Sequence, residues 1–443
     1  MKKILFITRP IAPPWDEASK NFAYNLARNL TSLPPSPSGR GAGGEGYLEI
    51  YLLTNGKLNN LPKNIIQENI YTSSEKDFKF SQKMRLLVFL IFNARKFNIV
   101  HLLFTPTKLS SWMLKIILSS PFRKGRLNAS ERSIQERFEK CTKTEKSHNH
   151  TKPFKSPLTP LFQRGRKSKI IQTIATLRED LLSDSEIKKM LFGDLIVTYS
   201  DYAKNRLEKL GFKNARRIYP GIDLDYYSPA RKNFRFLMNN NLRAEDFIIT
   251  YPGEYSRLGA IDDIVKAIVR IGAPSPSIPL PEGGGGKEIK FIFACRVKNE
   301  KDAKKKEKII KNLKKLNLLS KVVFIDTVPD MAKLYNSSDV IIFPARDMKG
   351  KFDVPLAVIE AMACAKPVII SDISVLREFA NRQNSVIIKS GDAEKLSGAI
   401  LDLYQNKTQR ETIGKTARKY AEENFDIKNI AGEYREIYES LGK

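Results

Sequence analysis

The stretch "KGKFDVPLAVIEAMACAKPVIISD", residues 349–372, begins as a loop and ends as a strand. Two carboxylates, Asp353 and Glu360, flank a Pro-Leu-Ala turn, and a run of small residues leads into a Val-Ile-Ile segment. Pro355 suits the first turn of a helix, where free N–H groups and the positive end of the helix dipole attract anions. The stretch therefore predicts a loop, a helix and a strand in succession, with an anion-binding site where the helix begins.

Strand-like and helix-like runs alternate along the rest of the chain. The apolar run "KILFIT" at residues 3–8 is typical of a strand buried on both faces of a parallel sheet. A polar stretch after residue 223 interrupts the alternation, which resumes with "FIITYPG" at residues 247–253. Two sets of βαβ units predict an α/β fold of two doubly wound, Rossmann-like domains that face each other across a cleft. We expect a first domain at residues 1–225, a linker at 226–246, a second domain at 247–410 and C-terminal helices at 411–443.

Three segments break the alternating pattern: residues 32–46, 121–169 and 272–286. Each is rich in Pro, Gly, Ser or charge, and each falls between a helix-like run and a strand-like run. Long surface loops cost little stability. We therefore expect all three segments to be surface insertions that the fold does not require.

The composition excludes several classes of protein. A chain of 443 residues with 42% hydrophobic residues is long and apolar enough for two folded domains. The cysteines Cys141, Cys295 and Cys364 form no CxxC pair or disulfide framework, which indicates a reducing cytoplasm. The apolar runs fall short of the roughly 20 residues that span a bilayer, and no secretory signal is recognisable. We therefore expect a cytoplasmic protein.

The net charge of +28 requires an anionic partner or another explanation. Residues 121–169 hold 14 Lys and Arg against 4 Glu, about a third of the excess. We favour a solvated loop over contact with an anionic membrane at the inner face of the cell, and both over nucleic-acid binding, because a recognised nucleic-acid-binding fold is missing. The helices expected at residues 81–96 and 108–118 mix basic with large apolar residues, and we favour them as core helices over membrane-surface helices.

The C-terminal half resembles a known family. "FDVPLAVIEAMACAKPVI" (352–369), preceded by "MAKLYNSSDVIIFPA" (331–345) and followed by "SGDAEKLSGAILDLY" (390–404), resembles the nucleotide-sugar-binding half of family 4 glycosyltransferases. "KILFITRPIAPPWDEASKNFAYNLARNL" (3–30) is similar to their acceptor half. The resemblance implies the GT-B architecture, with C-terminal helices that cross back to the first domain. It also implies retaining transfer of a hexose from a UDP- or GDP-linked sugar to a glycan or lipid-linked acceptor in cell-surface synthesis, without a metal or other cofactor.

The resemblance assigns a donor site to the opening stretch. The family pattern has two acids separated by seven residues, but Phe352 stands at the first position. The adjacent Asp353 therefore becomes the expected catalytic acid, in contact with the donor sugar. Glu360 corresponds to the acid that binds the ribose. The alternatives are a helix cap for Asp353 and an exposed helix surface for Glu360. The expected donor loop is completed by Val354, Pro355 and Leu356.

Family members stabilise the leaving diphosphate with an Arg and a Lys after the first strand of the second domain. In "PGEYSRLGA" (252–260), Glu254 stands at the arginine position and Leu258 at the lysine position. Arg257 therefore becomes the expected catalytic cation, with a solvated loop charge as its alternative. Further expected nucleotide-binding residues are Gly253 in the same loop and Arg296 and Lys298 in "ACRVKNE".

The acceptor side departs from the family as well. The histidine that many relatives place near the reacting sugar corresponds to Ala175, and His101 lies inside a strand, where packing is its favoured role. Retaining transfer that relies on positioning and electrostatics is compatible with the missing histidine. Asp223 and Asp225 form a DxD motif, but its place at the linker entry speaks against a metal site. The acceptor-side residues expected are Arg9, Trp15, Asp16, Ser19 and His101, with a helix-capping alternative for Asp16 and Ser19.

The altered cation loop keeps rival functions open. A catalytically inactive sugar-nucleotide-binding protein would tolerate it, and a sugar-nucleotide epimerase can share the same architecture. A transferase remains the favoured interpretation.

Overall fold

The structure is a computed structural model that describes residues 1–11, 18–32, 48–72, 80–103, 107–119, 168–272 and 287–441. The three predicted insertions lie outside the described residues apart from their terminal positions. Their role therefore stays a prediction.

The first domain is built on a seven-stranded parallel sheet with the order β3-β2-β1-β4-β5-β6-β7. Strand β1 pairs with β2 on one side and β4 on the other, so that Ile4 faces Ile50 and Ile99. The sequence did not indicate β3, whose "IIQEN" has only two apolar residues and lies at the sheet edge. The strands are β1 (Lys2–Ile7), β2 (Leu48–Thr54), β3 (Ile65–Asn69), β4 (Ile99–Leu102), β5 (Lys169–Ile174), β6 (Leu195–Thr198) and β7 (Ala215–Arg217).

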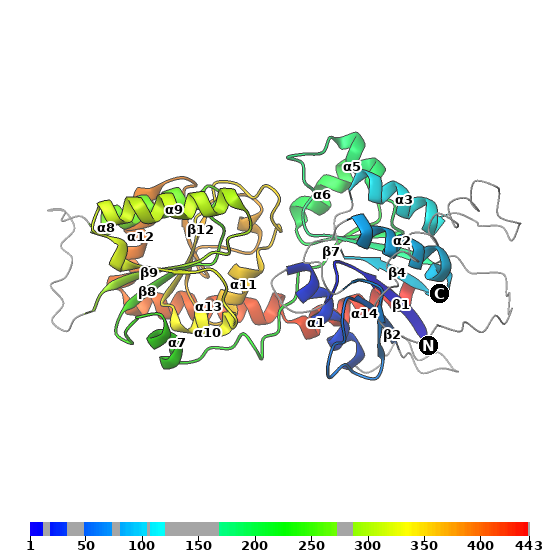
Figure 1. The fold of residues 1–443 in the computed structure, drawn as a ribbon, viewed down its shortest axis with the longest axis horizontal. Helices are drawn as coiled ribbons and strands as arrows, with labels where there is room; N and C mark the ends of the chain where they lie inside the picture. Colours follow the sequence, from blue (N-terminus) through cyan, green and yellow to red (C-terminus); the bar gives the residue numbers. More distant parts are fainter. Residues whose placement is uncertain are drawn as a thin grey trace, which may run out of the picture.

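Helices cover both faces of this sheet (Figure 1). Side chains alternate across a strand, so Ile4 and Phe6 of β1 join the core shared with α1, whereas Leu5 and Ile7 join the core shared with α2 and α3. The near-continuous apolar sequence of β1 is thus explained by burial on both faces. The helices of this domain are α1 (Ala18–Ser32), α2 (Phe80–Asn93), α3 (Lys108–Ser119), α5 (Asp184–Met190) and α6 (Asp201–Lys209), with the 3₁₀ turn η2 (Ala94–Lys96).

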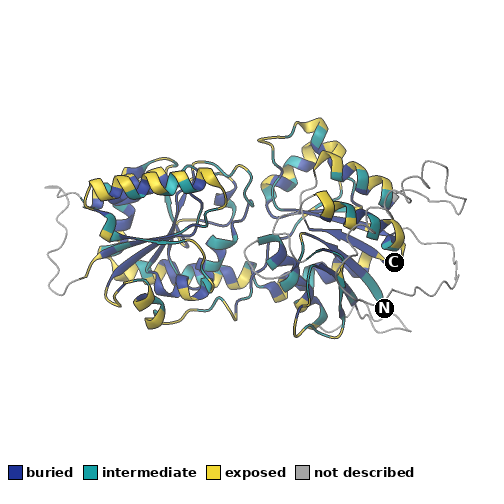
Figure 2. Ribbon diagram, viewed as in Figure 1, coloured by how far each residue is buried: buried dark blue, intermediate teal, exposed yellow. Residues whose placement is uncertain are grey.

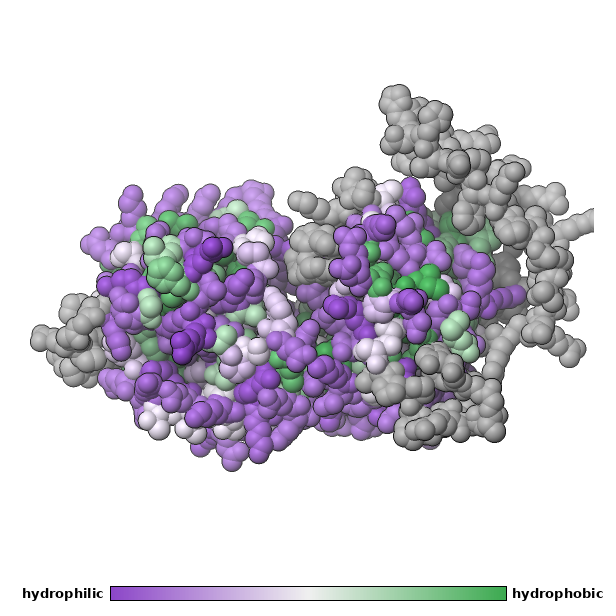
Figure 3. Space-filling view, turned by 90° about the horizontal axis from the view of Figure 1, so that it is seen from below, coloured by the Kyte–Doolittle hydropathy of each residue, from purple (hydrophilic) through white to green (hydrophobic). Residues whose placement is uncertain are grey.

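The predicted core role of α2 and α3 holds for one face of each helix. Leu86 and Leu90 of α2 and Leu114 of α3 are buried, whereas Phe92 is 71% and Trp112 62% exposed. Within the described residues, every helix is too short or too polar to span a lipid bilayer. On the face seen from below in Figure 3, hydrophilic residues cover most of the surface that the described residues form.

The second domain has a six-stranded parallel sheet with the order β10-β9-β8-β11-β12-β13. Its strands lie dark and buried between the helical layers (Figure 2). The strands are β8 (Phe247–Tyr251), β9 (Ile289–Ala294), β10 (Val322–Ile325), β11 (Val340–Phe343), β12 (Val368–Ser371) and β13 (Val386–Ile388). The helices are α8 (Ala260–Gly272), α9 (Glu300–Lys315), α10 (Met331–Ser337), α11 (Leu356–Ala363) and α12 (Ala393–Gln405), with the 3₁₀ turns η3 (Leu319–Lys321) and η4 (Leu376–Glu378).

Two long helices end the chain, and they lead from the second domain back to the first (Figure 1). They are α13 (Lys407–Asn424) and α14 (Ile427–Leu441). Helix α14 packs on α1 and on the first sheet, where Tyr438 Oη lies 2.7 Å from Nδ1 of His101 and Arg435 donates to the Leu30 carbonyl at 3.1 Å. The predicted return of the C-terminal helices is confirmed.

The segment between the two sheets contains a short helix that the sequence did not indicate. Helix α7 (Phe234–Asn239) starts where the Asn233 side chain accepts from the Phe236 N–H at 2.8 Å. Leu237 is buried against Ile248 of β8. A single buried leucine in a polar stretch gives no periodic signal, so only a linker was expected.

Candidate functional site

The second sheet reverses its direction of growth between β8 and β11, because β9 and β10 extend one side and β12 and β13 the other. In open α/β sheets, such a switch point forms a ligand-binding crevice outside the carboxyl ends of the strands. The loops that follow β8 and β11 meet there. Both belong to the part of the sequence from which a donor site was expected.

Glu254, in the loop after β8, is buried at the centre of a charged cluster. Its Oε1 accepts from Nζ of Lys351 at 2.6 Å and from Nζ of Lys298, and its Oε2 lies 3.7 Å from Nε of Arg257. Burial favours the neutral acid, but the two lysines outweigh burial and lower the pKa of Glu254 to about 2. Three cations therefore surround one ionised carboxylate. We call Glu254, Arg257, Lys298 and Lys351 the cation cluster.

Sequence reasoning missed Lys351, although it lies only two residues before Asp353. The signal that could have found it is the replacement of the family's arginine by Glu254, because a buried glutamate requires a cation. Glu254 and Lys351 lie far apart in the sequence, and they pair only because β8 and β11 are neighbours in the sheet. The expected ligands Arg257 and Lys298 do join the cluster, whereas Arg296 is half-buried in the loop after β9.

The loop after β8 has a tightly specified backbone. A Cβ on Gly253 would lie 2.0 Å from the Tyr251 ring, so only glycine fits there. Tyr251 Oη in turn lies 3.4 Å from the Glu254 N–H and 3.3 Å from its carbonyl oxygen. Leu258, at the family's lysine position, is buried with φ +66°. The loop thus presents Glu254 in a fixed place and turns Leu258 inward.

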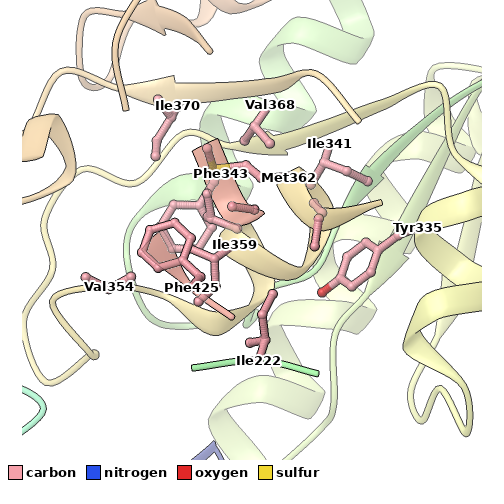
Figure 4. Close-up of a cluster of buried hydrophobic side chains, with 14 of the residues drawn as sticks. Ile222, Tyr335, Ile341, Phe343, Val354, Ile359, Met362, Val368, Ile370 and Phe425 are labelled. Atoms are coloured by element: carbon pink, nitrogen blue, oxygen red, sulfur yellow. The ribbon is translucent and has the colours of Figure 1, made fainter. Parts of the chain in front are cut away.

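Helix α11 is held in place by its apolar face. Ile359 and Met362 are buried among strand residues such as Ile341, and Phe425 at the end of α13 closes the cluster (Figure 4). Pro355 lies at the N-cap position and Leu356 is the first helical residue, one position later than expected for the proline. Val354 is buried in the same core. The N-terminal N–H groups of α11 therefore lie at the carboxyl edge of the sheet.

Glu360 lies on α11 between two tyrosines. Tyr335 of α10 donates to its Oε2 at 2.9 Å, and Tyr227 also donates to this carboxylate. Burial raises the pKa of Glu360 to about 7, against the two hydrogen bonds, which favour the charged form. The exposed-surface alternative is therefore wrong. A carboxylate has about four acceptor positions, so two tyrosines leave room for ligand hydroxyls.

Asp353 lies where the two domains touch. Its N–H donates to the Ala175 carbonyl at 2.9 Å, and its buried carboxylate accepts from the hydroxyls of Ser200 and Thr176. Burial raises the pKa of Asp353 to about 7. The side chain makes no cap of α11, so the capping alternative is wrong. The structure thus brings Asp353 to Ala175, the position that corresponds to the family's acceptor-side histidine.

The structure describes three of the five residues expected on the acceptor side. Arg9 follows β1 and is exposed, and Ser19 lies half-buried in the first turn of α1. Trp15 and Asp16 lie outside the described residues. His101 is fully buried, with Nδ1 on Tyr438 and Nε2 on Thr173, both at 2.7 Å, and burial lowers its pKa to about 3. His101 is therefore a packing residue, and its expected acceptor-side role is not supported.

The DxD motif is part of a turn. The Asp223 carboxylate accepts from the N–H groups of Asp225 and Tyr226, and Asp225 pairs with Lys428 of α14 at 2.8 Å. Among the described residues, no group of three or more His, Cys, Asp or Glu side chains is arranged to hold a metal ion.

Comparison with solved structures identifies the architecture. The structure of Anabaena Alr3699/HepE in complex with UDP and glucose superposes with a TM-score of 0.65 at 13% identity, covering 99% of this chain and all of that one. The sucrose-phosphate synthase of Thermosynechococcus elongatus superposes with a TM-score of 0.66 at 17% identity, covering 100% of this chain and 99% of that one. The predicted GT-B fold of two Rossmann-like domains is confirmed.

Sequence comparison finds a matching family model and several similar proteins. Residues 235–420, which contain the cation cluster and Glu360, match the family model of glycosyl transferases group 1. The capsular polysaccharide biosynthesis glycosyltransferase CapM of Staphylococcus aureus is 24% identical over 251 residues, 56% of this chain and 59% of CapM. Spore coat protein SA of Bacillus subtilis is 27% identical over 261 residues, 55% of this chain and 64% of that protein. The chain thus spans less than two thirds of the length of either curated relative.

Proposed function

We propose that the protein is a retaining glycosyltransferase that moves a hexose from a nucleoside-diphosphate sugar to a glycan or lipid-linked acceptor. The observation that carries the proposal is the cation cluster beside the start of α11, at the switch point of the domain that matches the family model. A diphosphate is the ligand that suits excess cations next to free helix N–H groups. UDP in the structure of Anabaena HepE supports the same ligand class.

Each group would have a distinct role in transfer. Arg257, Lys298 and Lys351 would stabilise the charge that develops on the leaving diphosphate, without a metal ion. Glu360 would accept hydrogen bonds from the ribose hydroxyls, and Asp353 would bind a hydroxyl of the donor sugar. The bond from C1 to the diphosphate oxygen breaks while the acceptor oxygen bonds to C1 on the same face. The acceptor proton then passes to an oxygen of the departing phosphate.

The acceptor is proposed to be a precursor of a cell-surface polysaccharide or glycolipid, with the protein working in the cytoplasm at the inner face of the membrane. CapM, named for capsular polysaccharide biosynthesis, supports this class of product. The exposed Phe92 and Trp112 on α2 and α3 would suit transient contact with lipid headgroups.

One assay tests the proposal. The full chain is incubated with a panel of UDP-, GDP- and dTDP-sugars, and nucleoside diphosphate release is measured for the unmodified protein and for Glu360→Ala. Release that the substitution abolishes supports a transferase. Binding without release from any donor would instead indicate an inactive sugar-nucleotide-binding protein, and formation of an epimeric nucleotide sugar would indicate an epimerase.

A further inference from the structure

Glu254 occupies the place of a family arginine, yet it is buried and paired rather than solvated. Its side chain arises from a loop that Gly253 and Tyr251 hold in one conformation. Its Oε1 receives two ammonium groups from different loops, Lys298 after β9 and Lys351 after β11. One carboxylate oxygen therefore determines where both ammonium groups lie.

The two lysines retain donors for a ligand. Each ammonium has three N–H groups, and the bond to Glu254 uses one of them. The side chains of Lys298 and Lys351 are 41% and 25% exposed, so the cluster is open on one side. The nearby Asp302 accepts from the backbone N–H of Lys298 and from the Ser256 hydroxyl, and so it fixes the loops rather than the ammonium groups.

Glu254 favours the charged form of Lys351. Burial lowers the pKa of Lys351, and the neighbouring cations Lys298 and Arg257 lower it further. Among the groups that face Lys351, Glu254 alone raises this pKa, through its negative charge and its hydrogen bond. The Cys295 thiol also lies close by, and burial raises its pKa to about 12, so it is neutral there.

We propose that Glu254 is a positioning residue that keeps Lys351 protonated and aimed, together with Lys298, at the diphosphate of the donor. The inference rests on the proposed function, since it assigns the diphosphate to the cation cluster. In this chain a carboxylate with two lysines replaces the arginine and lysine of the family.

The test is the pH profile of UDP affinity, with GDP measured in parallel by calorimetry between pH 7.5 and 10. Glu254→Gln keeps the size of the side chain but removes its charge. We expect about tenfold weaker binding, because a neutral amide holds the two ammonium groups less firmly than a carboxylate does. We also expect an alkaline loss of affinity that begins at lower pH than in the unmodified chain. Glu254→Asp should restore part of the affinity.

The double variant Glu254→Gln/Lys351→Arg separates charge from shape. A guanidinium does not titrate in this range, so the earlier onset of the alkaline loss of affinity should disappear. Lys351→Arg alone gives the same test if Glu254→Gln fails to fold. Unchanged affinity and pH profile in Glu254→Gln would overturn the inference. Tighter binding would overturn it as well, because it would show that Glu254 competes with the diphosphate. If the unmodified chain binds neither nucleotide, the proposed function fails instead.

Discussion

Lys351 is the most buried cation of the cation cluster. A mostly buried ammonium is costly unless it is paired, and this one is paired with Glu254 at 2.6 Å. Arg257 is more exposed and lies farther from the same carboxylate, at 3.7 Å. Charged hydrogen bonds gain strength as water is excluded, so Lys351 should contribute more to diphosphate binding than Arg257.

We expect Lys351→Ala to weaken UDP binding by about tenfold or more, because a charge-assisted hydrogen bond to phosphate is lost. Arg257→Ala should have a smaller effect. Calorimetric titration at pH 7.5 measures both. Lys349→Ala is the matched control, since Lys349 is exposed and lies in the same loop. An equal loss in the Lys349 variant would mean that only the general positive charge of the loop matters.

Glu360 makes stability depend on pH. Its usual pKa of 4.5 is raised to about 7 in the folded chain, so between these values the folded state binds more protons than the unfolded state. The contribution of this group therefore falls as pH rises from about 4.5 to 7 and stays low above that. We expect the free energy of unfolding of Glu360→Gln, which does not titrate, to rise by about 2–3 kcal/mol relative to that of the unmodified chain between pH 5 and pH 8.

Urea unfolding of both proteins at the two pH values measures this difference. Glu394→Gln is the control, because the Glu394 side chain is 74% exposed and should show the same pH dependence as the unmodified chain. A constant difference between Glu360→Gln and the unmodified chain would contradict the raised pKa of Glu360.

Among the elements, those with a strong period were predictable. The strands β1, β8, β11 and β12 are mostly continuous apolar runs, and α11 follows a proline and ends in a small-residue run. β3 and α7 were missed because each buries too few apolar side chains to form a pattern. Glu360 and Asp353 were identified from local sequence. Their partners Tyr335, Tyr227 and Ser200 come from other elements, and no local pattern indicates such pairings.

Helix α14 packs on the first sheet through polar as well as apolar contacts. Tyr438 and Tyr434 reach His101 and Thr173 inside the core, at 2.7 and 3.1 Å. A buried network of this kind is stabilising only when each member has its partner. This arrangement explains why a histidine is buried inside β4.

We expect Tyr438→Phe to destabilise the protein by about 1–3 kcal/mol, because it leaves Nδ1 of His101 buried without its hydrogen bond. Nucleoside diphosphate release per folded molecule should not change. Chemical unfolding and the release assay measure the two quantities. Tyr202→Phe is the control. Because Tyr202 is 45% exposed, this substitution should change the free energy of unfolding only slightly. Lost activity in a stably folded Tyr438 variant would point to a role for α14 in transfer.

For the whole molecule, the contact between domains centres on the N-terminus of α6. Glu378 of the second domain accepts from the backbone N–H groups of Asp201 and Tyr202, both at 2.7 Å. Ser200, the N-cap of α6, donates to Asp353 in the same place. Two carboxylates of one domain thus satisfy free N–H groups and a hydroxyl at a helix end of the other.

We expect Glu378→Ala to favour a more open arrangement of the two domains, because the N–H groups at the end of α6 would then bond to water. The closed form should lose about 1–2 kcal/mol of stability relative to the open form, as when a helix cap is removed. This is enough to shift a balanced equilibrium between the two forms several-fold. Small-angle X-ray scattering should show a larger radius of gyration. Asp372→Ala is the control, since its side chain is 60% exposed and lies in the same domain. If the radius stayed constant while the unfolding temperature fell, Glu378 would be stabilising the folded state without setting the balance between the closed and open forms.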